Sequence, residues 1–463
     1  MRTLGAHGSL DGLSSETFSV LQHCAINRPL FPNLKTVRLW NIVGEFIPLF
    51  LSPGTVGITI SFDERSRYPT ATVASIIDTL PALCPNLQDI TFYSLPGDPI
   101  ITAAVSGMLL ASNRNVLRSI KVDSPLEEGA REVIYKLPNL RTLSVVIKGG
   151  KSSPTVVLPN LTDLTIKYDH DGDWSKWFRG ATLGKLETVS FYPGSERIGN
   201  FLDEFERVAL ATHTQNTLSD FRLYTSCPWN PNYSSLLPFT QLTSLLIESH
   251  CENGCSSAVD DDVITTLART MPKLEFLWLG DQPCSEIPTG LTAKGLAVLA
   301  HHCPGLSTLC VHFHVASLND PPAVGGVVPN ARSAILQSGC TLTDLEVGEI
   351  PMLEEAVPTV ALTLALIFPH IETVDYIDEN WKKVLDAICL SREIINRSSK
   401  EHSSLHLESA LVIPLQELPS RAAVNRQTIL HDFTPAIPVP HSCCLAEVVI
   451  STSFESVLSA SLN

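Results

Sequence analysis

One segment of this 463-residue chain contains a histidine and several cysteines, residue types that can bind a metal ion. His250, Cys251 and Cys255, with Cys227 and Cys284 nearby, offer the imidazole and thiolate ligands that zinc binds. Two thiols at C-x3-C spacing suggest a site, but the second pair lacks C-x2-C or H-x3-H spacing. We therefore expect no metal here and keep a zinc site as the alternative.

An acidic segment imitates the start of a calcium-binding loop. Asp169, Asp171 and Asp173 match its first ligands, but Trp174 stands where the loop needs Gly and Gly180 where it needs Glu. We expect an acidic turn between two structural units.

The glycine-rich segment 180–185 is the nearest match to a phosphate-binding loop. It has three residues between its glycines instead of four, and Leu186 replaces the required Ser or Thr. The chain also has no G-x-S-x-G, H-E-x-x-H or G-x-G-x-x-G segment. We expect a protein that is not an enzyme and has no cofactor, the alternative being a catalytic site dispersed along the chain.

Charge and hydropathy limit the partners. The chain has 32 Lys+Arg and 48 Asp+Glu, a formal net charge of −16, which repels nucleic acid and anionic lipid. The N-terminus lacks the apolar core of a signal peptide, and the longest apolar stretch, Val360–Phe368, is far shorter than the roughly 20 residues of a membrane span. We expect a cytoplasmic or nuclear protein that binds neither nucleic acid nor membrane.

One repeated pattern runs along the chain: a Pro or similar breaker, then L-x-x-L-x-L or a variant. Clear copies are found at Pro32–Leu39, Pro85–Phe92, Pro138–Val145 and Pro159–Ile166. Weaker copies end at Val122, Phe191, Leu223, Ile247, Leu279, Val311, Val347 and Tyr376, and a degenerate copy lies near Ile60. These make about thirteen units at a spacing of roughly 21–36 residues, in or just beyond the range of leucine-rich repeats.

The pattern predicts a short strand in every unit. Its last two apolar positions point to the same face, and the residue between them points away. Stacked units bury that face as a parallel sheet with one continuous core. Apolar spacing near 3.6 predicts helices between strands, at Thr72–Leu83, Ile100–Leu110, Glu196–Ala211, Val263–Ala268, Ala293–Ala300 and Val384–Ile388.

We therefore predict an α/β leucine-rich-repeat solenoid, with a curved parallel sheet on the concave face and helices outside. Residues 31–395 form the solenoid, residues 1–30 an N-terminal cap or linker, and residues 396–463 an irregular tail that we expect to be partly disordered.

Two adjacent segments, Val259–Leu279 and Thr289–Val311, resemble the cysteine-containing leucine-rich repeats of F-box proteins. In that family a helix reading T-x-x-G-L-x-x-L-A ends in C-P-x-L before the next strand. The matching positions here are Leu291, Gly295, Leu296, Leu299, Cys303, Pro304 and Leu306, and the ending recurs at Cys84, Pro85 and Leu87. Ser14–Trp40 also resembles the segment that joins the F-box to the repeats in fungal members, so the resemblance covers residues 14–395. We expect Cys84 and Cys303 to pack as small apolar residues.

The resemblance implies a substrate receptor, in which the F-box docks on the adaptor of a cullin-type (SCF) ubiquitin ligase and the repeats hold the protein to be degraded. The opening Leu-Pro-x-Glu-type motif of an F-box is absent from this sequence, and about 30 residues precede the first repeat. This departure favours the alternative of a stand-alone repeat scaffold or regulator.

A partner would bind the concave face, which the middle strand positions and the residues just after each strand should line. Exposed aromatic residues on rigid strands suit an interface anchor, the alternative being that they only shield the strands. Basic residues fall in the first half of the chain and acidic ones at its end, so we expect a polarised groove. The predicted partner-binding residues are Arg38, Tyr93, Lys121, Tyr192, Arg222, Tyr224, Trp278, His312, Glu346 and Asp375.

Overall fold

The computed structural model describes residues 3–6, 20, 23, 30–40, 47–62, 69–93, 95, 98–148, 156–169, 182–183, 185–192, 201–226, 232–250, 259–279, 290–313, 315–318, 339–348, 350, 352–376 and 378–401.

Parallel strands form one sheet, in which the order in space follows the order in the chain from β1 to β14. Every predicted repeat supplies one strand, from β2 onwards. β1 lies within residues 1–30 and pairs with β2, Thr3 opposite Thr36. The strands are β1 (Thr3–Ala6), β2 (Thr36–Trp40), β3 (Gly57–Ser61), β4 (Asp89–Tyr93), β5 (Ser119–Pro125), β6 (Thr142–Lys148), β7 (Asp163–Asp169), β8 (Thr188–Tyr192), β9 (Asp220–Ser226), β10 (Ser244–His250), β11 (Phe276–Leu279), β12 (Thr308–Val311), β13 (Asp344–Gly348) and β14 (Thr373–Tyr376).

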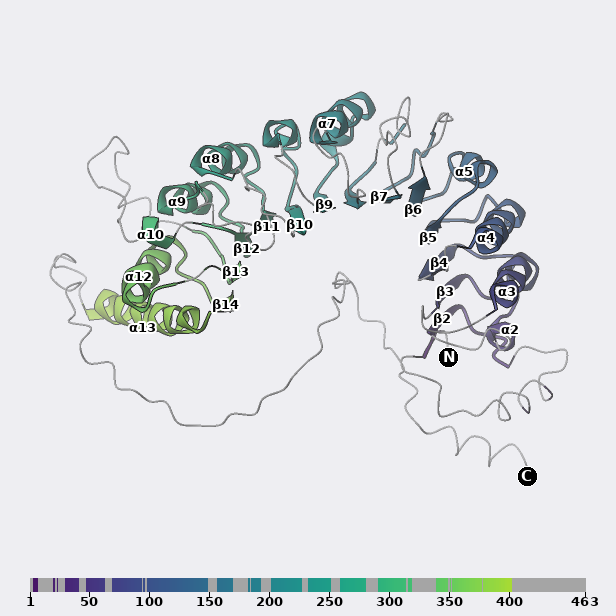
Figure 1. Cartoon of the computed structure of the whole chain (residues 1–463), viewed down its shortest axis with the longest axis horizontal. Helices are drawn as coiled ribbons and strands as arrows, with labels where there is room; N and C mark the ends of the chain where they lie inside the picture. The colour runs from purple at the N-terminus through teal and green to yellow at the C-terminus, as the bar shows by residue number, and fades with distance from the viewer. Residues whose placement is uncertain are drawn as a thin grey trace.

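The chain bends into an open arc, with the strands on its inner side and the helices on its outer side (Figure 1). The predicted α/β leucine-rich-repeat solenoid is thereby confirmed. The described helices are α2 (Ile47–Phe50), α3 (Thr70–Leu83), α4 (Pro99–Ala111), α5 (Glu128–Ile134), α7 (Phe201–Thr212), α8 (Asp261–Thr270), α9 (Ala293–His302), α10 (Val315–Leu318), α12 (Val357–Ile367) and α13 (Glu379–Glu401), with 3-10 turns η3 (Thr214–Asn216), η4 (Tyr233–Leu236) and η5 (Glu354–Ala356).

The repeat pattern explains the core between the two layers. In the first predicted unit Leu34, Val37 and Leu39 are at most 2% exposed, and the corresponding residues of later units are also buried, apart from the half-buried Tyr376 of the last unit. The middle of the solenoid adds aromatic packing: Phe205 of α7 stacks on Phe239 with ring centroids 5.3 Å apart, and Phe191 meets Phe201 at 4.8 Å. The hydrophobic effect therefore drives each unit onto its neighbours.

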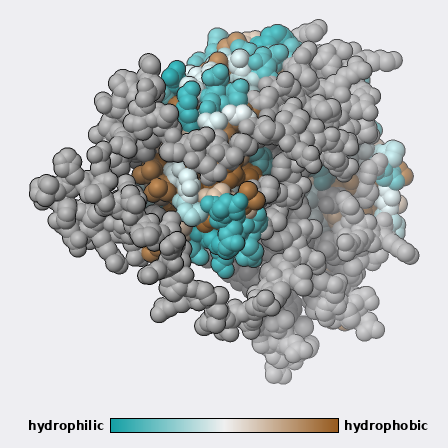
Figure 2. All heavy atoms as spheres, turned by 60° about the vertical axis from the view of Figure 1, so that its left-hand side comes forward, coloured by the Kyte–Doolittle hydropathy of each residue, from teal (hydrophilic) through white to brown (hydrophobic). Residues whose placement is uncertain are grey.

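The last unit is covered by α13, which continues past the expected solenoid end at residue 395 to Glu401. Trp381 at its start is fully buried, and its Nε1 donates a hydrogen bond of 2.9 Å to the Ile350 carbonyl. Seen from this side of the molecule, hydrophobic side chains reach the surface between hydrophilic ones (Figure 2). Among the helices described, none is long and apolar enough to cross a membrane.

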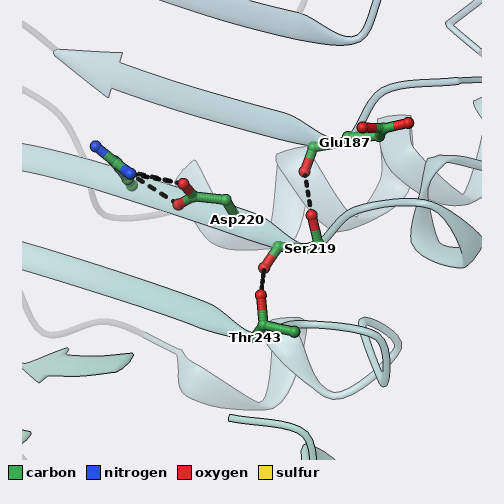
Figure 3. Close-up of polar contacts among 5 residues, drawn as sticks. Glu187, Ser219, Asp220 and Thr243 are labelled. Carbon is green, nitrogen blue, oxygen red and sulfur yellow. Dashed lines mark hydrogen bonds and ion pairs between the residues drawn. The ribbon is translucent and has the colours of Figure 1, made fainter. Parts of the chain in front are cut away.

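Each strand begins with a backbone ladder that links it to the unit before. The amides of Ser219 and Asp220 both donate to the Glu187 carbonyl, at 2.9 and 3.0 Å, and equivalent pairs recur from unit to unit. Side chains reinforce the ladder, since the Ser219 hydroxyl donates to the Glu187 carbonyl and the Thr243 hydroxyl to the Ser219 carbonyl (Figure 3). This ladder sets the register of neighbouring strands and so positions the side chains of the concave face.

Candidate protein-binding surface

The predicted middle positions form one continuous row across the sheet. Strand register places Arg38 opposite Thr59 at one end and Glu346 opposite Asp375 at the other. Between them the aligned residues are Thr91, Lys121, Ser144, Thr165, Ser190, Arg222, Leu246, Trp278 and Cys310. We call this set, from Arg38 to Asp375, the concave row.

Two of the predicted aromatic residues meet on adjacent strands. Tyr192 and Tyr224 stack with ring centroids 4.3 Å apart and planes only 4° from parallel. The ammonium of Lys167, opposite Tyr192 on the next strand, lies 5.8 Å from the centre of the Tyr192 ring. Burial, and then the neighbouring Tyr224 hydroxyl, raise the pKa of Tyr192, so the Tyr192 phenol is neutral near pH 7. The pair forms a flat, preordered aromatic surface at the centre of the sheet.

Arg222 precedes Tyr224 by two residues on β9 and is held by an acidic residue of the same strand. Its Nε and Nη2 both contact the Asp220 carboxylate, with the shortest distance 2.7 Å. The hydrogen bond to Asp220 is also the main cause of the raised pKa of Arg222. Because Asp220 neutralises it, Arg222 adds no net positive charge to the first half of the face. The charge difference between the two ends of the groove is therefore smaller than the positions of the basic residues alone indicated.

Trp278 lies two strands beyond Arg222, separated from it by Leu246. Its indole stacks on Phe276 of the same strand, with centroids 6.2 Å apart and planes 15° from parallel. The Trp278 Nε1 atom is buried and has no hydrogen-bond partner in the described part of the chain. Trp278 and Tyr224 therefore belong to two separate aromatic groups on the same face.

The remaining predicted residues lie toward the two ends of the sheet. Arg38 is exposed on β2, and Tyr93 at the end of β4 is 41% exposed. Partial burial and then the Asp123 carboxylate raise the pKa of Tyr93, whereas the nearby Arg38 lowers it. Lys121 on β5 is half-buried. Burial raises the pKa of Asp89, and the nearby cations Arg118 and Lys121 offset part of that rise.

At the opposite end, Glu346 and His312 are half-buried, and Asp375 is exposed. Cys310 is only 5% exposed although it occupies the concave row, because the longer Trp278 and Glu346 stand on either side of it. The row is therefore not accessible at every position, and its long side chains form its surface.

Asp220 and Phe276 were missed by the sequence analysis. Both precede a predicted residue by two positions, and the period of a strand places residues i and i+2 on one face. That spacing was readable in the sequence. The repeat also placed Tyr192 and Tyr224 opposite each other, since both directly follow the last apolar position of adjacent units. The parallel stacking of their rings was not readable, because it depends on side-chain conformation.

The predicted packing of the cysteines is confirmed. Cys84 and Cys303 are at most 1% exposed, and Cys340, which the sequence analysis did not single out, is fully buried as well. Cys303 Sγ lies 3.5 Å from the Met271 carbonyl of the preceding unit. Burial raises the pKa of Cys84 to about 11 and that of Cys303 to about 12, so both stay protonated thiols near pH 7.

The other ligand candidates fall largely outside the described residues. His250 ends β10, but Cys227, Cys251, Cys255 and Cys284 lie outside the described ranges, as do Asp171 and Asp173. Within those ranges no group of three or more His, Cys, Asp or Glu side chains is arranged to hold a metal ion.

No known family model matches the sequence, and no curated protein matches it. Solved structures give distant matches. A chain of the Rad7–Elc1 complex of yeast is 16% identical, with 59% of this chain and 77% of that chain covered and a TM-score of 0.31. A Bacteroides fragilis protein is 12% identical, with coverages of 50% and 67% and a TM-score of 0.26. The leucine-rich-repeat protein LegL7 of Legionella pneumophila is 12% identical, with coverages of 87% and 98% and a TM-score of 0.27. Such low values carry no inference about function.

Proposed function

We propose that this protein binds another protein on the concave face of its sheet. The stacked Tyr192–Tyr224 pair carries the proposal. Large rings that are already ordered lose little conformational entropy on binding, and tyrosine is enriched among the residues that dominate interface energies. Strands at about 4.8 Å spacing give a face on the order of 60 Å long, enough for the roughly 800 Å² per partner of a standard interface.

Affinity capture from the protein's own cells tests this proposal with a matched pair of variants. Tyr192→Ser combined with Tyr224→Ser alters the concave face, and Leu110→Ser combined with Leu210→Ser removes two exposed hydrophobic residues of helices α4 and α7. We expect the first variant to lose the specific partners of the wild type and the second to keep them. Partners that survive the tyrosine changes, or depend on the helical side, would contradict concave-face binding.

We further propose that the bound protein is a substrate for ubiquitin-dependent degradation and that this chain acts as a receptor arm of a cullin-type ligase. The resemblance to the cysteine-containing repeats of F-box proteins supports this step, and the buried Cys84 and Cys303 occupy the bend that the motif assigns to them. Recovery of a cullin and its adaptor in the same capture is the expected result. Specific partners without any ligase subunit would instead indicate a stand-alone repeat scaffold.

A further inference from the structure

The concave face of β10–β14 differs in charge from the rest of the sheet. The concave-facing positions described on these strands include four carboxylates, Glu248, Asp344, Glu346 and Asp375, and no Lys or Arg. On the strands before them, cations and acids are mixed. Arg222 is paired with Asp220, and Lys121 lies near Asp89. Negative potential is therefore concentrated at the C-terminal end of the groove, in a chain whose net charge is −16.

An aromatic side chain lies beside these acids in the same row. Register places Trp278 next to Cys310, then Glu346, then Asp375, so Trp278 and Glu346 are two strands, or about 10 Å, apart. The stacking of Trp278 on Phe276 fixes the plane of the indole. A cation is attracted to the face of an indole more strongly than to the other aromatic rings. An aromatic face followed by carboxylates fits an extended segment that carries positive side chains.

We propose that the concave face of β10–β14 binds a Lys- or Arg-bearing extended segment of the protein partner. One cationic side chain of that segment packs against Trp278, and the next pair with Glu346 and Asp375. Alternate residues of an extended chain are about 7 Å apart, which allows neighbouring cations to reach the indole and the carboxylates in turn. This inference rests on the proposed function and adds the chemical class of the partner.

Fluorescence anisotropy with labelled peptides of alternating Arg and Ser, or of alternating Glu and Ser, tests the proposal on the full-length protein. We expect the Arg peptide to bind, more weakly as salt rises, and the Glu peptide not to bind. Glu346→Gln with Asp375→Asn should weaken binding about tenfold or more, and Trp278→Ala by a further several-fold at unchanged charge.

The matched control is Glu128→Gln with Glu132→Gln, which removes the same charge from exposed positions of α5. Binding should change less than about twofold in this variant, because α5 lies on the outer side of the arc. An equal loss of peptide affinity in both double variants would overturn the proposal, because the peptide would then be attracted only by the net negative charge of the protein. The exposed Asp375 and half-buried Glu346 keep the test valid even if Trp278→Ala fails to fold.

The two proposals can fail separately. If cell partners depend on Tyr192 and Tyr224 but the Arg peptide does not bind, the concave face is the binding surface and its partner is not basic. If the Arg peptide binds β10–β14 but the binding of cell partners does not depend on the concave face, the proposed function is wrong. The affinity of β10–β14 for a basic segment is then still supported.

Discussion

Gly295 lies where two neighbouring units approach each other closely. It lies in α9, and its amide donates a hydrogen bond of 3.1 Å to Oδ1 of Asp261 in the unit before. A Cβ at this position would collide with that oxygen and lie 2.6 Å from Leu291 Cδ1. The glycine of the repeat motif therefore has a steric explanation.

We expect Gly295→Ala to lower the free energy of unfolding by about 1–3 kcal/mol, the usual cost of overpacking. Urea unfolding followed by circular dichroism measures it. Gly129→Ala is the control: a Cβ there meets nothing within 4 Å, so this helical substitution should be neutral or stabilising by up to about 1 kcal/mol. Equal effects at both sites would contradict the steric explanation.

The buried thiols make stability depend on alkaline pH. Burial, and then Cys340, raise the pKa of Cys303 from 9.0 to about 12. Above pH 9 the unfolded chain releases this proton while the folded chain retains it, so the free energy of unfolding falls as pH rises. We expect Cys303 to contribute a slope of up to about 1.4 kcal/mol per pH unit.

Urea unfolding of reduced protein between about pH 8 and pH 11 measures this slope. The slope should be smaller in Cys303→Ala than in the wild type. An unchanged slope in Cys303→Ala would show that this thiol does not titrate differently on unfolding.

At the scale of elements, Asp261 of α8 holds the start of the next helix. Its carboxylate accepts hydrogen bonds from the Thr292 amide at 2.8 Å, the Thr292 hydroxyl at 2.7 Å and the Gly295 amide. Thr292 in turn caps α9 through the Lys294 amide. One side chain thus fixes the position of α9 on α8 and satisfies amides that a helix start leaves unpaired.

Asp261→Ala should lower the free energy of unfolding by about 1–3 kcal/mol, because it leaves these donors without an acceptor. Asp262→Ala, one residue along and exposed, should cost less than about 1 kcal/mol. Hydrogen exchange at the first turn of α9 is the measurement, and faster exchange is expected only in Asp261→Ala. Similar exchange in both variants would mean that the cap does not hold the helix.

The elements themselves were predictable because their signals are local. The alternation of apolar residues within six positions defined each strand, and the aligned middle positions follow once every unit repeats the same turn. The spacing of apolar residues likewise located α3, α4 and α9 to within two residues at each end. By contrast, Asp261 acts on residues 31 and 34 positions later, and nothing local distinguishes it from Asp262. β1 was missed for the same reason, since TLGA has no L-x-x-L-x-L pattern and gains its strand from pairing with β2.

At the scale of the whole molecule, each unit is stabilised by its contacts with the neighbouring units. The strands pair strictly in chain order, and each helix packs on the helices beside it. A solenoid of this kind is stabilised by the sum of unit and interface terms, and its ends need covers for their apolar edges. At the C-terminal end α13 provides the cover, with Trp381 in edge-to-face contact with Phe313 at 5.9 Å.

Trp381→Ala therefore tests how far along the solenoid a loss of packing at the C-terminal end destabilises the units. Removing a fully buried Trp costs about 3–5 kcal/mol, and here it also leaves the Ile350 carbonyl without its indole donor. We expect hydrogen exchange to accelerate in α12, β13 and β14 while β2 to β5 keep their protection, because the strands from β6 to β12 lie between the two regions in the sheet. Lys382→Ala, at the exposed neighbouring position, should leave both regions unchanged. Uniform acceleration from β2 to β14 would instead mean that the arc unfolds as one unit and that its stability is not a sum over neighbours.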